Sequence, residues 1–321
     1  MATILVTGGC GFIGSHLCAA LQARGDRVRV LDDLSTGSEA NLAPGAALVI
    51  GDVSRPDTIR RALAGVDAVF HLAAVASVER AVQDWYGTHC INLSATVALL
   101  EAAKAQGTPV VYASSAAVYG DAADLPLDVA TATRPLSAYG ADKLGCEQHA
   151  RVAGHTHNLR TAGLRFFNVY GPRQDPRSPY SGVISVFCDK LSRHEPVNVF
   201  GDGGQTRDFV YVGDVVRMLL AALPAASTAA PVFNVCTGQP TSVLELAATI
   251  ADLCGQPADI RHQPPRSGEI RHSLGRPSAI GEAGEADFVS LRDGLAETLA
   301  WLGAGRPGLA QHSGPFLALS A

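Results

Sequence analysis

The chain has 321 residues, which is long enough for one large or two modest domains with a sizeable core. Its composition, 47% hydrophobic and 17% charged, is typical of a folded globular protein and excludes a disordered chain. The formal net charge of −5, without a basic cluster, argues against a nucleic-acid partner, so an anionic ligand has to be held by local groups.

The cysteine, histidine and hydropathy patterns restrict the class of protein further. Seven cysteines are scattered and form no C-x-x-C pair, which favours reduced cytoplasmic thiols over a disulfide framework or a zinc site. None of the ten histidines has H-E-x-x-H spacing, so we expect no metal. No signal-peptide pattern is visible, and the most apolar helical stretch, residues 215–223, is too short to span a bilayer. We therefore expect a cytoplasmic protein without a membrane partner.

The first half of the chain alternates short apolar runs with amphipathic stretches. Such strands, separated by helices, predict a parallel sheet that is covered on both faces, which is a doubly wound α/β fold. The predicted strands are residues 3–7, 27–31, 47–50, 68–72, 109–113 and 159–164, and the predicted helices are residues 12–24, 56–64, 85–106 and 137–154.

After residue 165 the pattern changes. Residues 168–182 are rich in glycine and proline and predict a long loop. A capping box of Ser242 and Glu245 marks a helix start in the last third. The chain thus predicts an N-terminal domain of residues 1–165 and a smaller mixed α/β lobe of residues 166–321, whose segments can interleave. The other elements expected in this lobe are a helix at 183–194, strands at 197–200 and 207–212, a helix from 213 and a strand at 231–235.

A glycine-rich turn joins the first predicted strand to the first predicted helix. Gly8, Gly11 and Gly14 have G-x-x-G-x-x-G spacing, and the segment also satisfies G-x-G-x-x-G from Gly9. Such a turn lets the backbone approach a pyrophosphate closely, and the helix N-terminus offers free N–H groups to the phosphates. The turn therefore predicts a dinucleotide site.

An acidic residue, Asp32, ends the second predicted strand. A carboxylate at this position binds the adenosine ribose hydroxyls and repels a 2′-phosphate, and no arginine follows to accept one, so NAD is favoured over NADP. His71 lies in the same row of strand ends and is better explained as a buried core histidine than as a ligand. The residues expected to contact the cofactor are Gly8, Gly11, Phe12, Ile13, Gly14, Asp32, Asp33, Ser35, Thr36, Gly37, Asp52, Val53, Leu72, Ala73 and Ala74.

Residues 110–143 carry the reactive groups. Tyr139 and Lys143 are four apart in a predicted helix and so lie on one face. A lysine beside a phenol favours the phenolate, which makes an acid/base group. Ser115 follows the fifth predicted strand. Together with the dinucleotide site, these residues predict a hydride-transfer enzyme.

With both motifs present, the chain resembles the extended short-chain dehydrogenase/reductases, and among them the nucleoside-diphosphate-sugar 4-epimerases. The resemblance covers essentially the full length, through HLAAVASVERAV, CIN, RFFNVYGPRQ, GDGGQTRDFVYVGDV and RSGEIRHS. It implies an NAD-binding Rossmann domain, a permanently bound NAD, and a UDP-sugar that is epimerised at C4 through a transient 4-keto sugar. It also implies a homodimer joined through the helices at 85–106 and 137–154.

The resemblance assigns roles to single residues. Tyr139 resembles the catalytic base and acid, Lys143 its partner that also holds the nicotinamide ribose, and Ser115 the hydroxyl that binds the sugar O4. Asn92 and Phe167 resemble further cofactor contacts. The substrate contacts implied are Asn168, Phe200, Arg207 and Arg266 for the diphosphate and base, Glu269 for the nucleoside ribose, and Ser77, Gln174 and Ser273 near the sugar.

Two alanines discriminate among reactions in this family. Related 4,6-dehydratases carry acidic residues after the strand-end hydroxyl, and decarboxylating members keep a glutamate there, whereas Ser115 is followed by Ala116 and Ala117. Alanine cannot transfer a proton, so epimerisation is favoured. A reductive or bifunctional enzyme, which would alter other sugar positions, stays an alternative. A non-catalytic NAD sensor would have no need of Tyr139 and Lys143.

Ser273 bears on which sugar is accepted. This position is a bulky tyrosine in family members restricted to glucose and galactose, and it is small in members that admit a 2-N-acetyl group. Serine therefore predicts that UDP-GlcNAc and UDP-GalNAc are accepted alongside UDP-Glc and UDP-Gal. UDP-glucuronate is the alternative, because Arg173 or Arg177 could pair with its carboxylate, although Asp175 in the same loop opposes a second negative charge.

Overall fold

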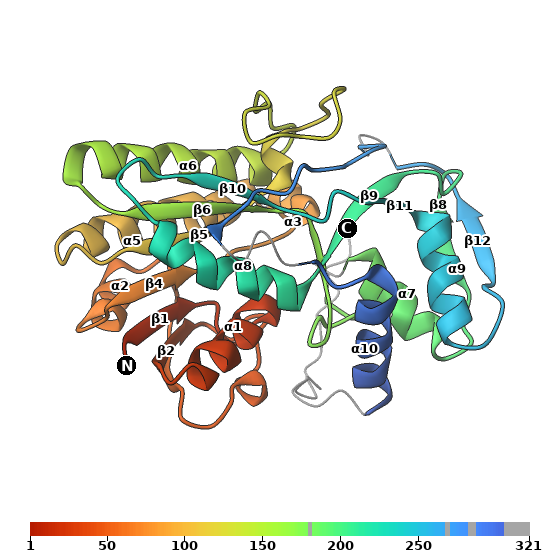
Figure 1. The fold of residues 1–321 in the computed structure, drawn as a ribbon, viewed down its shortest axis with the longest axis horizontal. Helices are drawn as coiled ribbons and strands as arrows, with labels where there is room; N and C mark the ends of the chain where they lie inside the picture. The colour runs from red at the N-terminus through yellow and green to blue at the C-terminus, as the bar shows by residue number, and fades with distance from the viewer. Residues whose placement is uncertain (179–181, 267–269, 282–286, 305–321) are drawn as a thin grey trace.

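The computed structural model describes residues 1–178, 182–266, 270–281 and 287–304 (Figure 1). Seven parallel strands form one sheet in the order β10-β6-β5-β4-β1-β2-β3. This sheet confirms the predicted doubly wound α/β fold. Its strands are β1 (Thr3–Thr7), β2 (Arg27–Asp32), β3 (Ala47–Ile50), β4 (Ala68–His71), β5 (Val110–Ser115), β6 (Thr161–Phe166) and β10 (Val232–Val235).

Helices cover both faces of the sheet (Figure 1). On one face α1 (Phe12–Ala23) and α8 (Val212–Ala225) bury leucines, valines and a methionine against β1, β2, β5 and β6. On the other face lie α2 (Pro56–Leu63), α5 (Ala95–Lys104) and α6 (Ala138–His157). Strands enclosed on both sides need apolar residues at consecutive positions, which explains the uninterrupted apolar runs in the sequence.

The second half of the chain builds a smaller lobe and also contributes to the large sheet. β10 pairs with β6, and α8 packs beside α1, so the chain returns to the first sheet after residue 166. This return is the interleaving that the sequence left open. The smaller lobe contains the sheet β11-β9-β7, made of Pro240–Ser242, Thr206–Tyr211 and Asn168–Tyr170, the strand pair β12 (Ile260–Gln263) and β8 (Val197–Phe200), and helices α7 (Val183–Leu191), α9 (Val243–Leu253) and α10 (Leu291–Gly303). The capping box predicted at the start of α9 is present.

The helix predicted over residues 85–106 is interrupted. After α3 (Val78–Gln83), the chain forms α4 (Trp85–His89), a π-helical turn η2 (Cys90–Ser94), and then α5. Inside the turn, Asn92 accepts a hydrogen bond from the Val75 N–H (2.8 Å) and donates one to the Val75 carbonyl (3.2 Å). Single π turns are rare and occur mostly at functional sites. Here the turn aims an amide side chain at the loop that follows β4.

His71 is the buried core histidine that the sequence favoured. Thr96 donates its hydroxyl proton to the Asn92 carbonyl (2.7 Å), so it must accept from Nε2–H of His71 (3.0 Å). Thr7 accepts from the Ala73 N–H (3.1 Å) and donates to Nδ1 of His71 (2.7 Å). Burial lowers the pKa of His71 to about 3, so the ring is neutral and ties β1, β4 and the helical layer together.

Two further observations concern ions and membranes. Among the residues that the structure describes, no group of three or more His, Cys, Asp or Glu side chains is arranged to hold a metal ion. In the same residues, no helix combines the length and the apolar character that crossing a bilayer requires.

Candidate active site

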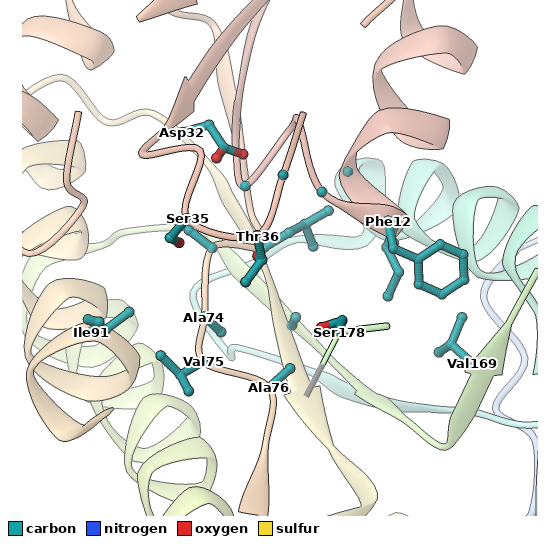
Figure 2. A pocket seen from close by; sticks show the side chains of 18 of the residues that line it. Phe12, Asp32, Ser35, Thr36, Ala74, Val75, Ala76, Ile91, Val169 and Ser178 are labelled. Atoms are coloured by element: carbon teal, nitrogen blue, oxygen red, sulfur yellow. The ribbon is translucent and has the colours of Figure 1, made fainter. Parts of the chain in front are cut away.

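A cleft of about 470 Å³ opens at the carboxyl ends of the central strands. It lies where the strand order reverses between β1 and β4, which is where ligands bind in doubly wound sheets. Figure 2 shows Phe12 and Val169 on one side of the cleft and Val75 and Ile91 on the other. The predicted site residues that line it are Gly8, Gly11, Phe12, Ile13, Gly14, Asp32, Asp33, Ser35, Thr36, Gly37, Asp52, Val53, Leu72, Ala73, Ala74, Ser115, Tyr139, Lys143, Phe167, Asn168 and Gln174.

The glycine-rich turn forms the floor of the cleft at the start of α1. Gly8 has φ +72°, and a Cβ there would lie 2.8 Å from the Ala73 nitrogen in the loop after β4. A Cβ at Gly14 would overlap the Gly8 carbonyl oxygen. α1 begins after Gly11 without a side-chain cap, so the N–H groups of its first turn remain available to an anion. The turn is therefore shaped for a pyrophosphate.

Asp32 stands at the end of β2 beside the same turn (Figure 2). Its carboxylate accepts hydrogen bonds from the N–H groups of Cys10 and Leu34, both at 2.9 Å. Burial raises its pKa, and the two N–H donors oppose that effect. A carboxylate fixed in this way fits the ribose of a dinucleotide, so the turn and Asp32 together suit NAD.

Tyr139 and Lys143 are brought together with Ser115, as the sequence predicted. The buried ammonium of Lys143 donates to the Ala113 carbonyl (2.9 Å) and lies 5.9 Å from the centroid of the Tyr139 ring. Ser115 caps the 3₁₀ turn η3 (Ala116–Val118) by accepting from the Ala117 N–H (3.1 Å). The absence of a side chain at Gly140 lets α6 approach this turn, because a Cβ there would lie 2.6 Å from the Ala117 carbonyl oxygen. The cleft thus holds a phenol, an ammonium and a hydroxyl.

A buried polar network holds this group in register. Glu147 of α6 accepts from Arg165 Nε (2.9 Å) and Nη2 (2.7 Å), and it also accepts from the Ser114 hydroxyl (2.5 Å). Arg165 Nη1 donates to the Tyr119 hydroxyl (2.8 Å), which donates to Asn234 of β10 (2.6 Å). The network therefore links α6 to β5, β6 and β10 directly behind Ser115.

Most of the other predicted substrate residues lie in the smaller lobe. The Arg266 guanidinium stacks over the Phe200 ring at 4.0 Å. Arg207 donates from Nη1 to the Thr206 carbonyl (2.9 Å), and the Ser273 N–H donates to the same carbonyl (3.1 Å), so these two residues are close together. All four lie outside the cleft lining described above.

Three predicted residues lie elsewhere. Ser77 caps α3, where its hydroxyl accepts from the Arg80 N–H (3.1 Å), and it does not line the cleft. Asn92 lies behind the cleft and acts through Val75, which does line it. Glu269 lies outside the described residues.

Several polar residues that line the cleft are not among the site residues predicted from the sequence: Ser38, Asn41, Ser114, Arg173, Asp175 and Ser178. Arg173 belongs to the quoted stretch RFFNVYGPRQ, but it was considered only as a partner for a sugar carboxylate. Asn41 had no motif signal, because it enters the site only through the turn η1 (Glu39–Asn41) after β2.

The chain is similar to known proteins over nearly its whole length. Residues 4–236 match the model of the NAD dependent epimerase/dehydratase family. The UDP-glucose 4-epimerase of Mycolicibacterium smegmatis is 37% identical over 304 residues, which cover 92% of this chain and 96% of that protein. The dTDP-glucose 4,6-dehydratase of an Actinoplanes species is 34% identical over 320 residues, covering 94% and 98% respectively.

Solved structures agree with the sequence relatives. The UDP-glucose 4-epimerase of Thermotoga maritima, solved with UDP-glucose, is similar with a TM-score of 0.90 at 34% identity, over 94% of this chain and 99% of that one. The UDP-N-acetylglucosamine 4-epimerase of Methanobrevibacter ruminantium, solved with UDP-N-acetylmuramic acid, has a TM-score of 0.89 at 32% identity, over 95% and 99%.

The close approach at Gly8 generates a first prediction. Gly8→Ala adds a Cβ against the Ala73 backbone and should lower NAD affinity about 5- to 150-fold, since such overpacking costs about 1–3 kcal/mol. Gly65→Ala is the matched control, because Gly65 has a similar φ of +68° with no atom within 4 Å of its Cβ. Calorimetric titration of NAD into both variants, after the bound nucleotide has been removed, tests this, and equal affinities would contradict it.

Proposed function

The chain belongs to the NAD-dependent epimerase/dehydratase family, and from this membership we propose that it interconverts UDP-sugars that differ in configuration at C4. The protein is an NAD-dependent isomerase, as are the 4-epimerases that resemble it over nearly its whole length. We propose UDP-Glc and UDP-Gal as one substrate pair and UDP-GlcNAc and UDP-GalNAc as a second.

The arrangement of Tyr139, Lys143 and Ser115 carries this proposal. In the proposed reaction the Tyr139 phenolate takes the proton of the 4-hydroxyl and later returns it to O4 of the other epimer. The Lys143 ammonium lies 5.9 Å from the centroid of the Tyr139 ring, beside the group that exchanges the proton. The Ser115 oxygen already accepts from the Ala117 N–H, which leaves its proton to be donated to O4. Bound NAD supplies the redox chemistry at C4.

The turn after Ser115 supports epimerisation over dehydration. The 4,6-dehydratase relative makes elimination the main competitor, and elimination needs a group that moves protons at C5 and C6. Ala116 and Ala117 belong to the turn η3 directly after Ser115, which lines the cleft, and their methyl side chains have no proton to give. The residues next to the phenol therefore suffice for oxidation and re-reduction at C4 alone.

The positions of two arginines disfavour UDP-glucuronate. Arg177 pairs with Asp175 through Nε (3.3 Å). Arg173 donates to the Asn41 carbonyl (3.3 Å), which belongs to the turn after β2 and to the cofactor end of the cleft. The hydrogen-bond partners of both guanidinium groups therefore lie away from Ser115, where the sugar is proposed to bind. Neither arginine is placed to pair with the carboxylate of a glucuronate.

The activity is tested by incubating the protein separately with UDP-Glc, UDP-GlcNAc and UDP-GlcA, without added NAD, and following the anomeric NMR signals. We expect C4 epimers of the first two sugars. Tyr139→Phe should lower turnover about 10²- to 10⁴-fold through loss of the proton-transfer group, while the NAD content stays unchanged. A 4-keto-6-deoxy product, or no turnover, would exclude the proposed activity.

Acceptance of the N-acetyl sugars rests on Ser273. This half-buried residue donates its N–H to the Thr206 carbonyl beside Arg207, and its small side chain is proposed to leave room for the 2-N-acetyl group. Ser273→Tyr should reduce kcat/KM for UDP-GlcNAc at least about tenfold more than for UDP-Glc, a difference near 1.4 kcal/mol. Ser273→Ala should keep both activities. Equal losses on both substrates after Ser273→Tyr would remove Ser273 from the argument about specificity.

We also propose a homodimer through α3, α4 and α6. Val82, Trp85 and Tyr86 are 76%, 69% and 80% exposed, and Val152 of α6 is 52% exposed. Large apolar side chains gathered on neighbouring helices are typical of a protein interface.

A cytoplasmic location is proposed as well, supported by seven free thiols, and cell fractionation would test it.

The dimer is tested by sedimentation. We expect wild-type protein to sediment at about twice the chain mass of 33.3 kDa, and Trp85→Asp to sediment as a monomer because it places a charge in the apolar contact. Ile50→Asp is the control, since Ile50 is 62% exposed at the end of β3, the far edge strand of the sheet. A monomeric wild type would refute the dimer.

A further inference from the structure

The segment 171–174 connects two walls of the cleft at its cofactor end. The Pro172 carbonyl accepts a hydrogen bond from Nε2 of His16 in α1 (2.9 Å). The next residue, Arg173, donates from Nη1 to the Asn41 carbonyl (3.3 Å) in the turn after β2. Asn41 in turn donates from Nδ2 to the Cys10 carbonyl in the glycine-rich turn (2.9 Å). The segment is thus attached to both elements that flank the glycine-rich turn.

Arg173 brings a positive charge to this place without a carboxylate partner. Among the described residues it forms no ion pair, whereas Arg177 in the same loop pairs with Asp175. The Arg173 side chain lines the cleft together with Gly11 and Gly37, and burial lowers its pKa. A partly buried guanidinium without a counter-ion is unfavourable on its own, so the site is incomplete until an anion is present.

The backbone also points to a fixed purpose for this residue. Arg173 has φ +67°, a left-handed conformation that is unfavourable for a residue with a Cβ. His16 offsets part of this by holding the neighbouring carbonyl, and the His16 ring packs edge-on against Phe12 of the first turn of α1 at 6.1 Å. In this conformation Arg173 lines the cleft together with Gly11, the residue before the start of α1, and reaches the Asn41 carbonyl.

We propose that Arg173 binds the pyrophosphate of NAD from the side opposite the glycine-rich turn, and that His16 positions it through Pro172. The inference rests on the family's use of NAD and adds a cation to the N–H donors of the glycine-rich turn. A sugar-nucleotide diphosphate has the same chemistry. NAD is favoured because every anchor of Arg173 belongs to α1 or to the turn after β2, while Arg207 and Arg266 lie in the smaller lobe.

The test measures how fast bound NAD exchanges with isotope-labelled NAD, by mass spectrometry of the nucleotide released on denaturation. Arg173→Gln should accelerate exchange about 10- to 100-fold, because it removes a charge-assisted hydrogen bond. Arg177→Gln, in the same loop, should exchange at the wild-type rate. Arg173→Lys should stay within about threefold of wild type, and circular dichroism checks that each variant is folded.

A second measurement separates the two diphosphates. Calorimetric titration of UDP into the NAD-saturated protein should give the same dissociation constant for wild type and Arg173→Gln. Weaker UDP binding by Arg173→Gln, with unchanged NAD exchange, would overturn the assignment to NAD. So would NAD exchange at the wild-type rate in Arg173→Gln.

The positioning role has its own variants. His16→Leu should accelerate NAD exchange although Arg173 is intact, and His16→Gln, which can still donate to Pro172, should recover most of the retention. Wild-type exchange in His16→Leu would refute the role of His16. NAD exchange needs no turnover, so a failure of Arg173 to retain NAD and a failure of the proposed epimerase activity are observed separately.

Discussion

The buried ion pair between Glu147 and Arg165 is the interaction on which the geometry of the site depends. The two side chains are 6% and 7% exposed, and every carboxylate oxygen of Glu147 has a donor. Tyr139, Lys143 and Glu147 are spaced by four along α6, so they lie on one face of the helix.

Anchoring Glu147 at the far end of this face therefore sets where the phenol and the ammonium lie over β5. Removal of one partner from a buried pair costs about 3–5 kcal/mol, because the other charge is left uncompensated. Such a pair contributes more to a unique arrangement than to net stability. In this chain the uniqueness is needed, because proton transfer requires the phenol, the hydroxyl and the sugar to lie within hydrogen-bond reach of one another.

A second buried carboxylate has a comparable role in the smaller lobe. Asp208 of β9 accepts hydrogen bonds from the N–H groups of Thr237 (2.7 Å), Gly238 (2.9 Å) and Gly275 (3.3 Å). Asp208 therefore joins three segments that are distant in sequence. It follows Arg207 in β9, and the Gly275 that it holds is two residues after Ser273. The two ends of the proposed substrate site are thus each organised around one buried acid whose oxygens are saturated with donors.

The parts of the site that the sequence predicts are those encoded by short spacing. The turn from Gly8 to Gly14, the acid at the end of β2, and the four-residue interval between Tyr139 and Lys143 each need only local geometry to acquire meaning. The periodicity of apolar residues likewise predicts the six N-terminal strands of the parallel sheet to within a few residues.

What the sequence does not predict depends on contacts between distant segments. Arg173 reaches the cofactor end only because the loop after β7 folds back onto Asn41 and His16. The π turn around Asn92 forms because its amide is paired with Val75, 17 residues earlier, which no helical periodicity reveals. The strand at 232–235 has the apolar pattern of any strand, and its place beside β6 is decided by packing of the whole second half.

That placement of β10 links the two lobes during synthesis as well as in the finished molecule. A nascent chain that ends after β6 has an unpaired strand edge, because the strand that covers it is encoded only after β7, β8, β9 and α8. Exposed strand edges are templates for association with other chains. The large sheet therefore cannot be completed co-translationally until α7, β8, β9 and α8 have left the ribosome, so residues 1–166 alone do not form the whole sheet.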